Sequence, residues 1–277
     1  MSDEIEELIE EAKREGFLLC KTTHPEGPGA PGCWLGGLPT LPENLEWPLT
    51  QGSGIPDIPL HFVAQINLAS LPLHDGHPAM PRTGTLFFFI DPIFGPSFEY
   101  SASTAVVLYS TEDVSSVPER QMPPIDLASC STDDMSWDYR RNPPHAFGLK
   151  KWNIKFVSRV GYDEHLFRDP DYENPEAEAA VVQLKVDEND RLRKVLKEHY
   201  SGGDKRATHS MLAGPNSRGE RYDGSISYMT DEIPLLSVRA DTSIGLKLQE
   251  EWVVFWIKEN ALSSADFASV VVFEGLG

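Results

Sequence analysis

Three short segments in the first half of the chain have counterparts in the second half, in the same order, and this repeat constrains the fold more than any other feature. Each set contains a turn of small residues, a strand introduced by a proline, and a strongly apolar strand. The first set is Trp34–Thr40, Ile58–Asn67 and Thr85–Asp91, and the second set is Met211–Asn216, Ile233–Asp241 and Trp252–Lys258. We therefore predict an internal duplication whose two copies are related by a pseudo-twofold axis.

The rest of the sequence adds a few helices and further strands. Residues 3–15 carry apolar side chains at helical spacing, and Gly16 supplies a stop signal. Residues 190–200 form a second predicted helix, whereas residues 177–186 fit either a helix or a strand. Further strands are predicted at 17–21, 105–110, 154–161 and 269–274. The predicted fold class is α+β, internally duplicated, with mostly antiparallel sheets and a few flanking helices.

The predicted organisation has three parts that pack as one body. They are an N-terminal helix over residues 1–16, a first half with its connection over 17–150, and a second half over 151–277. The connection itself is the turn-rich, polar stretch 111–149. Because ligand sites often lie between packed units, a cleft between the two halves is the expected place for one.

The charge balance limits the kinds of partner. With 24 basic and 43 acidic residues the formal net charge is −19, which disfavours nucleic acids and anionic membranes. Solubility is the simpler interpretation of this charge, and a basic protein partner or mimicry of a nucleic acid is the more specific one. The apolar runs are too short to span a bilayer, and the acidic start lacks the features of a signal peptide. Three widely spaced cysteines, Cys20, Cys33 and Cys130, argue against a disulfide framework. A cytoplasmic location is therefore expected.

Several of the repeated segments resemble the YwqG-like family, a domain-of-unknown-function family found mainly in bacteria. The resemblance rests on Leu35–Pro48, Leu60–Leu68, Gly84–Asp91 and the closing segment Phe255–Leu262 with Asp266 and Phe267. The second half departs from the family pattern at Arg239–Asp241, Ala213–Pro215 and Lys247–Glu251. The resemblance implies a fold but no activity, and it implies that any site shared between the halves is altered in this chain.

Polar residues near the ends of the repeated strands are the first candidates for a binding site. Gln65 and Asn67 alternate along a strand and so point to one side, and Arg239 and Asp241 show the same alternation in the second half. These four either bond to neighbouring groups, Arg239 and Asp241 as an ion pair, or line a shared cleft. Trp47 is interpreted as part of a turn over the core, or as an aromatic binding surface.

Histidines are the second set of candidates. His74 and His77 are three apart and could share a metal ion with a carboxylate, although they lie in a loop and the spacing implies no third ligand. A plain surface loop is the simpler interpretation, so no metal or other cofactor is predicted. His61 lies within a strand, where a core or groove histidine is expected.

No catalytic motif is present, so no catalytic residue is assigned and a non-enzymatic function is favoured. The sequence predicts a binding or protein-interaction module with an acidic surface. The alternative is a metal-dependent hydrolase that uses His61, His74 or His77 with nearby carboxylates, or a small-molecule sensor, with its site in the cleft between the halves.

Overall fold

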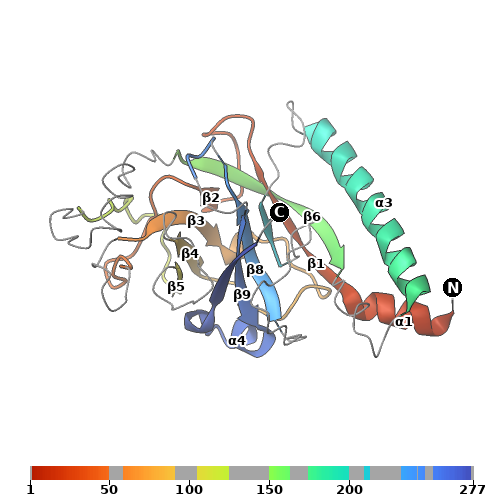
Figure 1. Ribbon diagram of the computed structural model, residues 1–277. Helices are drawn as coiled ribbons and strands as arrows, with labels where there is room; N and C mark the ends of the chain where they lie inside the picture. Colours follow the sequence, from red (N-terminus) through yellow and green to blue (C-terminus); the bar gives the residue numbers. More distant parts are fainter. Residues whose placement is uncertain are drawn as a thin grey trace, which may run out of the picture.

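The computed structural model describes residues 2–49, 59–90, 105–124, 150–162, 174–199, 209–212, 232–241, 243–246 and 252–275 (Figure 1). The strands are β1 (Lys13–Lys21), β2 (Trp34–Leu35), β3 (His61–Asn67), β4 (Thr85–Ile90), β5 (Ala105–Ser110), β6 (Trp152–Tyr162), β7 (His209–Met211), β8 (Glu232–Arg239), β9 (Trp252–Lys258) and β10 (Val271–Gly275). The helices are α1 (Asp3–Ala12), α3 (Pro175–His199) and α4 (Glu259–Ser263), with 3-10 turns η1 (Leu68–Ser70) and η5 (Phe267–Ser269). Cys130 and the segments 213–215 and 247–251 lie outside the described residues.

All these strands belong to one ten-stranded sheet in which neighbouring strands are antiparallel. The α+β class that the sequence predicts is therefore wrong, since the fold is mostly β. The physical reason is that two very short strands, β2 and β7, join what the sequence presents as separate sheets. Segments of two or three residues carry no readable alternation, so the sequence pattern does not reveal them.

The sheet curls until strands from its two ends face each other across an apolar interior. The rings of Phe88 in β4 and Phe255 in β9 meet edge to face with centroids 5.2 Å apart. Tyr109 of β5 contacts Phe267 of η5, with centroids 5.0 Å apart. These contacts give the sheet a nearly closed, barrel-like form, and the buried apolar residues of both halves fill one continuous core.

The strand order is symmetric about the centre of the sheet. It runs β10-β9-β8-β7-β1-β6-β2-β3-β4-β5, so exchanging β1–β5 with β6–β10 reproduces the same order. Both β3 and β8 also carry a register shift, between Phe62 and Ala64 in β3 and between Pro234 and Leu236 in β8. This is the order that an internal duplication requires, although the duplication itself stays a prediction.

The two register shifts change the expected correspondence between the halves. Counting from them, Gln65 corresponds to Ser237, and Asn67 corresponds to Arg239 rather than to Asp241. Asp241 follows β8 and forms an isolated bridge with Leu246. The pairing of Asn67 with Asp241 in the sequence comparison is therefore offset by two residues.

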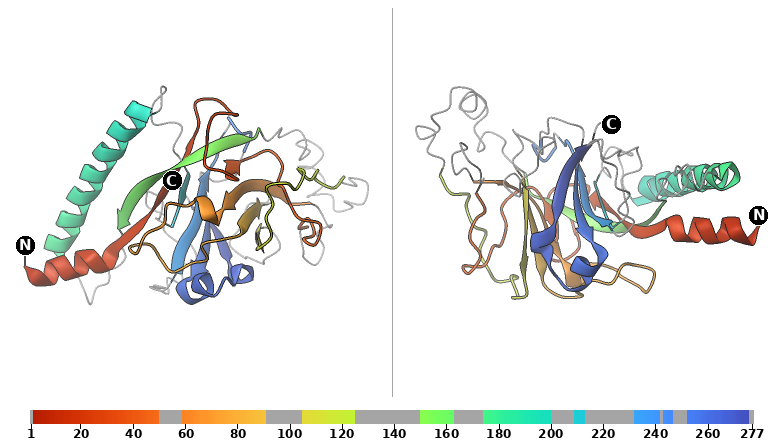
Figure 2. Two further views of the ribbon diagram at one scale, coloured as in Figure 1. Left: turned by 180° about the vertical axis from the view of Figure 1, so that it is seen from behind. Right: turned by 60° about the horizontal axis from the view of Figure 1, so that its bottom comes forward.

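Helices α1 and α3 pack against each other and extend beyond the sheet (Figure 2). Ile5 and Ile9 of α1 contact Ala177 and Val181 of α3, while the later part of α3 covers apolar residues of β1 and β6. The hydroxyl of Ser2 caps α1 by accepting the Ile5 N–H at 3.4 Å. Residues 177–186 and 190–200 thus belong largely to one long helix rather than to separate elements.

Helix α1 ends earlier than its apolar periodicity predicts. Lys13 is already extended and pairs with Tyr162, and Gly16 pairs with Arg159 in the same ladder. Residues 13–15 are therefore strand, because the long partner β6 offers them backbone hydrogen bonds. Among the described residues, no helix has a stretch long and apolar enough to cross a membrane.

Candidate functional site

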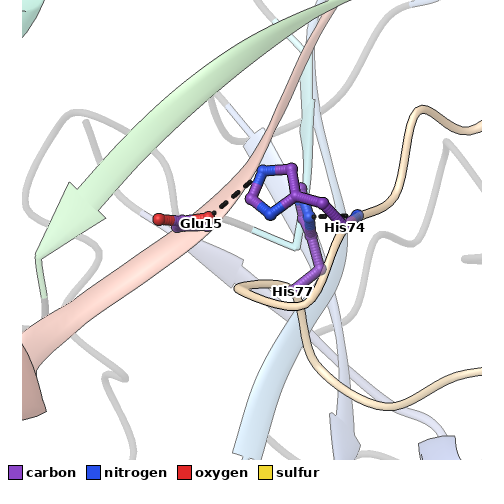
Figure 3. A group of neighbouring side chains, drawn as sticks. All are labelled: Glu15, His74 and His77. Carbon is purple, nitrogen blue, oxygen red and sulfur yellow. Dashed lines mark hydrogen bonds and ion pairs between the residues drawn. The ribbon is translucent and has the colours of Figure 1, made fainter.

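A group of three possible metal ligands, here called the histidine cluster, forms where β1 passes the loop at residues 71–84. It consists of Glu15, His74 and His77, and one ligand atom from each lies within 4.8 Å of those from the other two. Both imidazoles come from the loop, and His74 reaches across to the Glu15 carboxylate on β1 (Figure 3). The atoms His74 Nε2 and Glu15 Oε2 are 3.3 Å apart. A candidate third ligand therefore lies beside the loop and comes from a distant part of the sequence.

Hydrogen bonds within the loop fix the two imidazole rings. The His74 N–H donates to His77 Nδ1 at 3.2 Å, and the Gly76 N–H donates to His74 Nδ1 at 3.1 Å. The His77 N–H donates to the His74 carbonyl at 3.0 Å, which closes the turn. Because both Nδ1 atoms accept hydrogen bonds, each neutral ring carries its proton on Nε2.

His77 is the buried member of the cluster. Its ring stacks on Phe17, with centroids 4.6 Å apart and planes at 13°, and only 8% of the residue is exposed. Burial lowers the pKa of His77, and the neighbouring His74 lowers it further. Its Nε2 has no hydrogen-bond partner among the described residues. A buried polar atom without a partner is uncommon in folded proteins, so this nitrogen needs an explanation.

Gly76 leaves room for the Glu15 carboxylate. A Cβ atom at this position would overlap Glu15 Oε2 and would lie 3.1 Å from His74 Cε1. The backbone at Gly76 is not left-handed, so its conformation does not require glycine. Close approach of the acid to the loop is the feature that a side chain would prevent. The other oxygen, Glu15 Oε1, lies 3.3 Å from Lys13 Nζ.

A second polar group, here called the buried ion group, consists of Lys21, His209, Asp241 and Ser243. Lys21 of β1 donates to Asp241 Oδ2 and to the Ser243 hydroxyl. His209 Nε2 lies 3.2 Å from the same Asp241 oxygen, and the Arg239 N–H donates to His209 Nδ1 at 3.2 Å. The Ser243 N–H and hydroxyl donate to Asp241 Oδ1 at 2.9 and 2.7 Å. Both oxygens of this carboxylate thus accept two hydrogen bonds.

The surroundings of the buried ion group favour a charged Asp241 beside a neutral His209. Burial alone would raise the pKa of Asp241, but hydrogen bonds from His209, Lys21 and Ser243 outweigh it and hold that pKa below its usual value. Burial lowers the pKa of His209. Lys21 is 2% exposed and His209 is fully buried, so this group links β1, β7 and the turn after β8 rather than facing a ligand.

The strand-end residues predicted from the sequence lie in separate hydrogen-bond networks. The Gln65 side chain accepts from the N–H and hydroxyl of Thr40 at 2.9 and 3.1 Å and donates to the Gly32 carbonyl at 3.5 Å. The Asn67 side chain accepts from the Ala69 N–H at 3.1 Å and so caps η1. Asp241 instead bonds within the buried ion group. The structure therefore does not bring these side chains together around one ligand position.

Of the other predicted residues, Trp47 and His61 lie in the core. Trp47 is buried against Phe89 with ring centroids 5.3 Å apart, and its Nε1–H donates to the Leu60 carbonyl at 2.9 Å. His61 is buried in β3, where burial lowers its pKa to about 4. Arg239 is half-buried at the end of β8, and its backbone N–H bonds to His209. These positions agree with structural roles for Trp47 and His61.

Helix α1, which precedes β1, presents an acidic surface. Its acidic residues are Asp3, Glu4, Glu6, Glu7, Glu10 and Glu11, and all six are exposed. The acidic start of the chain is visible in the sequence, but Glu15, Lys21 and His209 were missed. Glu15 falls in the predicted helix, and the other two carry no local signal, because their partners are remote in sequence.

Comparison with known proteins gives one family match. The family model described as "Domain of unknown function (DUF1963)" matches residues 34–273. The matched stretch includes the His74–His77 loop and begins after Glu15. It confirms the prediction of a domain-of-unknown-function family, while the finer YwqG-like assignment stays a prediction. No curated protein matches the chain.

Proposed function

We propose a non-enzymatic binding function for this chain, which belongs to the DUF1963 family of domains of unknown function. Its partner is a basic protein, and the contact surface is the exposed acidic face of α1. The observation that carries this proposal is the division of α1 into two faces. Ile5, Ile9 and Ala12 are buried, mainly against α3, while the acidic residues point outward.

Helix stability accounts for only part of this acidity. Acids in the first turn favour a helix because they interact well with the positive end of its dipole, and Asp3, Glu4 and Glu6 lie there. Glu10 and Glu11 lie in the last turn, where carboxylates oppose the dipole. Lys13 compensates one of them through an ion pair with Glu10 at 3.0 Å. Recognition of a positive partner accounts for the remaining negative charge.

The position of α1 supports the same proposal. The helix lies at one end of the molecule, with only one of its faces against α3, so a partner can approach its outer face (Figure 2). The net charge of −19 adds long-range attraction for a basic partner. Such attraction weakens with ionic strength, so the association is expected to be sensitive to salt.

The hydrolase alternative finds less support in the arrangement of its proposed residues. His61 is buried in β3 and is not one of the grouped ligands, which are Glu15, His74 and His77. The proposed cleft residues Gln65 and Asn67 are engaged in bonds within their own half. A binding function needs no such convergence of reactive groups.

The test is a pull-down with the tagged chain from an extract of its own cell, at low and high salt, followed by affinity measurements with the partner. The informative variant is Glu7→Gln/Glu10→Gln/Glu11→Gln, which removes charge from the later part of α1. It keeps the acids of the first turn, whose interaction with the helix dipole stabilises the helix. The matched control is Glu26→Gln/Glu43→Gln/Glu46→Gln, which changes the net charge equally at exposed positions elsewhere.

We expect the helix variant to lose most of the affinity and the control variant to retain it. Equal losses in both variants would show that net charge, rather than the α1 face, attracts the partner. Absence of any stoichiometric, salt-sensitive partner at low salt would reject the proposed function.

A further inference from the structure

We propose that the histidine cluster, Glu15 with His74 and His77, binds one divalent transition-metal ion of the zinc class. This site is distinct from the acidic face of α1 and does not depend on it. The proposal rests on the donor set, the spacing of the donors, the unpaired nitrogen of His77 and the room that Gly76 provides.

The spacing of two donors already suits a metal ion. In a tetrahedral zinc site, bonds of about 2.0–2.2 Å place neighbouring ligand atoms roughly 3.3 Å apart. His74 Nε2 and Glu15 Oε2 are separated by 3.3 Å. The widest separation allowed in the group is 4.8 Å, so only a modest movement of the third donor is needed. The His74 side chain is 57% exposed, which gives an ion a route from solvent.

The chemistry of the donors selects the class of ion. Two imidazoles with one carboxylate suit Zn²⁺, Co²⁺ or Ni²⁺, whereas Mg²⁺ and Ca²⁺ require oxygen ligands almost exclusively. Three protein ligands leave at least one coordination position for water or another small ligand. A purely electrostatic interaction with the acidic surface would not make this distinction.

The buried ring of His77 supplies an independent observation. Its stacking on Phe17 fixes the plane of the ring, and its Nε2 has no hydrogen-bond partner among the described residues. A ring held in place with one unused nitrogen is an incomplete arrangement. Coordination of an ion through Nε2 would complete it.

Metal binding requires the His74–His77 turn to rearrange. Both Nδ1 atoms now accept backbone N–H groups, from His74 and from Gly76. If Nε2 binds the ion, the ring proton moves to Nδ1, which can no longer accept a hydrogen bond. If Nδ1 binds the ion instead, its lone pair is used. In either case these two amide hydrogen bonds break.

The experiment is calorimetric titration of the metal-free full chain with Zn²⁺, together with the absorption spectrum of the Co²⁺ complex. We expect one ion per chain, Co²⁺ bands typical of nitrogen and oxygen ligands, and no competition from excess Ca²⁺. The amide resonances of His74 and Gly76 should shift on Zn²⁺ binding. His74→Ala and His77→Ala should each weaken binding by roughly 100-fold, and the control His24→Ala, at an exposed histidine elsewhere, should not.

Gly76→Ala is the sharpest variant, since the added methyl group displaces the Glu15 carboxylate without removing any ligand. It should weaken Zn²⁺ binding roughly tenfold while the chain stays folded. The proposal is overturned if Zn²⁺ does not bind, or if Gly76→Ala and His74→Ala bind as tightly as the control. The Glu7→Gln/Glu10→Gln/Glu11→Gln variant should keep its Zn²⁺ affinity, so failure of the metal site and failure of the proposed protein partner can be told apart.

Discussion

The histidine cluster and the buried ion group both use a charged residue of β1, yet they differ in how completely their polar atoms are paired. In the buried ion group each oxygen of Asp241 accepts two hydrogen bonds, and the side chains are almost inaccessible to water. In the histidine cluster a buried nitrogen of His77 has no partner in the described residues, and His74 is largely exposed. A group whose hydrogen bonds are complete holds the fold together, whereas an incomplete group at the surface retains capacity for a ligand.

The largest effect that separates the two groups is expected at Asp241. Asp241→Ala leaves Lys21 charged and buried without its partner, which should lower the free energy of unfolding by about 3–5 kcal/mol. Urea unfolding of this variant beside His74→Ala measures the difference. A loss below about 1 kcal/mol at Asp241 would show that the buried ion group is not the structural link described above.

Acid should lower the free energy of unfolding through the buried histidines. Burial lowers the pKa of His209 and lowers that of His61 to about 4, so the unfolded chain binds protons near pH 6.5 that the folded chain excludes. The contribution of these two histidines to the free energy of unfolding is thus constant above that pH and falls below it, with His61 alone losing about 3 kcal/mol by pH 4. Asp241, whose pKa is lowered, adds a further loss as the pH falls through the usual aspartate pKa of about 4 and continues below it.

The measurement for this prediction is urea unfolding at a series of pH values for the wild type and His61→Gln. The variant should show a shallower decline below pH 6.5. Parallel curves would mean that His61 accepts a proton as readily in the folded chain as in the unfolded one.

Lys21 and Asp241 should be strongly coupled. Lys21→Met leaves an unbalanced carboxylate, and a following Asp241→Asn removes that charge, so the double variant should lose less stability than the sum of the single variants. The expected coupling is about 1–3 kcal/mol in a double-mutant cycle. Additive losses would indicate that the two charges are screened from each other.

The smallest effects are expected in the histidine cluster. Glu15→Gln and Gly76→Ala should each change the free energy of unfolding of the metal-free chain by less than about 1 kcal/mol, because the Glu15 pairs with Lys13 and His74 are partly exposed. Urea unfolding in the presence of a chelator tests this. A loss as large as that of Asp241→Ala would remove the distinction between the two groups.

Strands with a strong local pattern could be predicted from the sequence, and elements defined by remote pairing could not. The strand Ala105–Ser110 agrees with its prediction, and β4 differs from its predicted range only at Asp91, which lies outside the described residues. The strands β2 and β7 were missed because they are defined only by their partners. The α+β prediction was wrong for the same reason, since these two strands join the other strands into a single sheet.

The candidate site was predictable only in part. The spacing of His74 and His77 is visible in the sequence, but Glu15 lies in an apolar periodicity that predicts helix. Its position beside the histidines follows from the extension of β1 along β6, which depends on the tertiary register. Asp241 was singled out from the sequence, while its partners Lys21 and His209 come from other strands.

The symmetric strand order has a consequence for how the chain assembles. β1 lies between β7 and β6, and β6 lies between β1 and β2, so each half gives its first strand to the other half, as in a domain swap. A fragment ending after β5 would leave β2 without its neighbour, and a fragment starting at β6 would leave β7 in the same condition. Neither fragment has a complete sheet. When the two fragments are co-expressed, however, they should reassemble by fragment complementation.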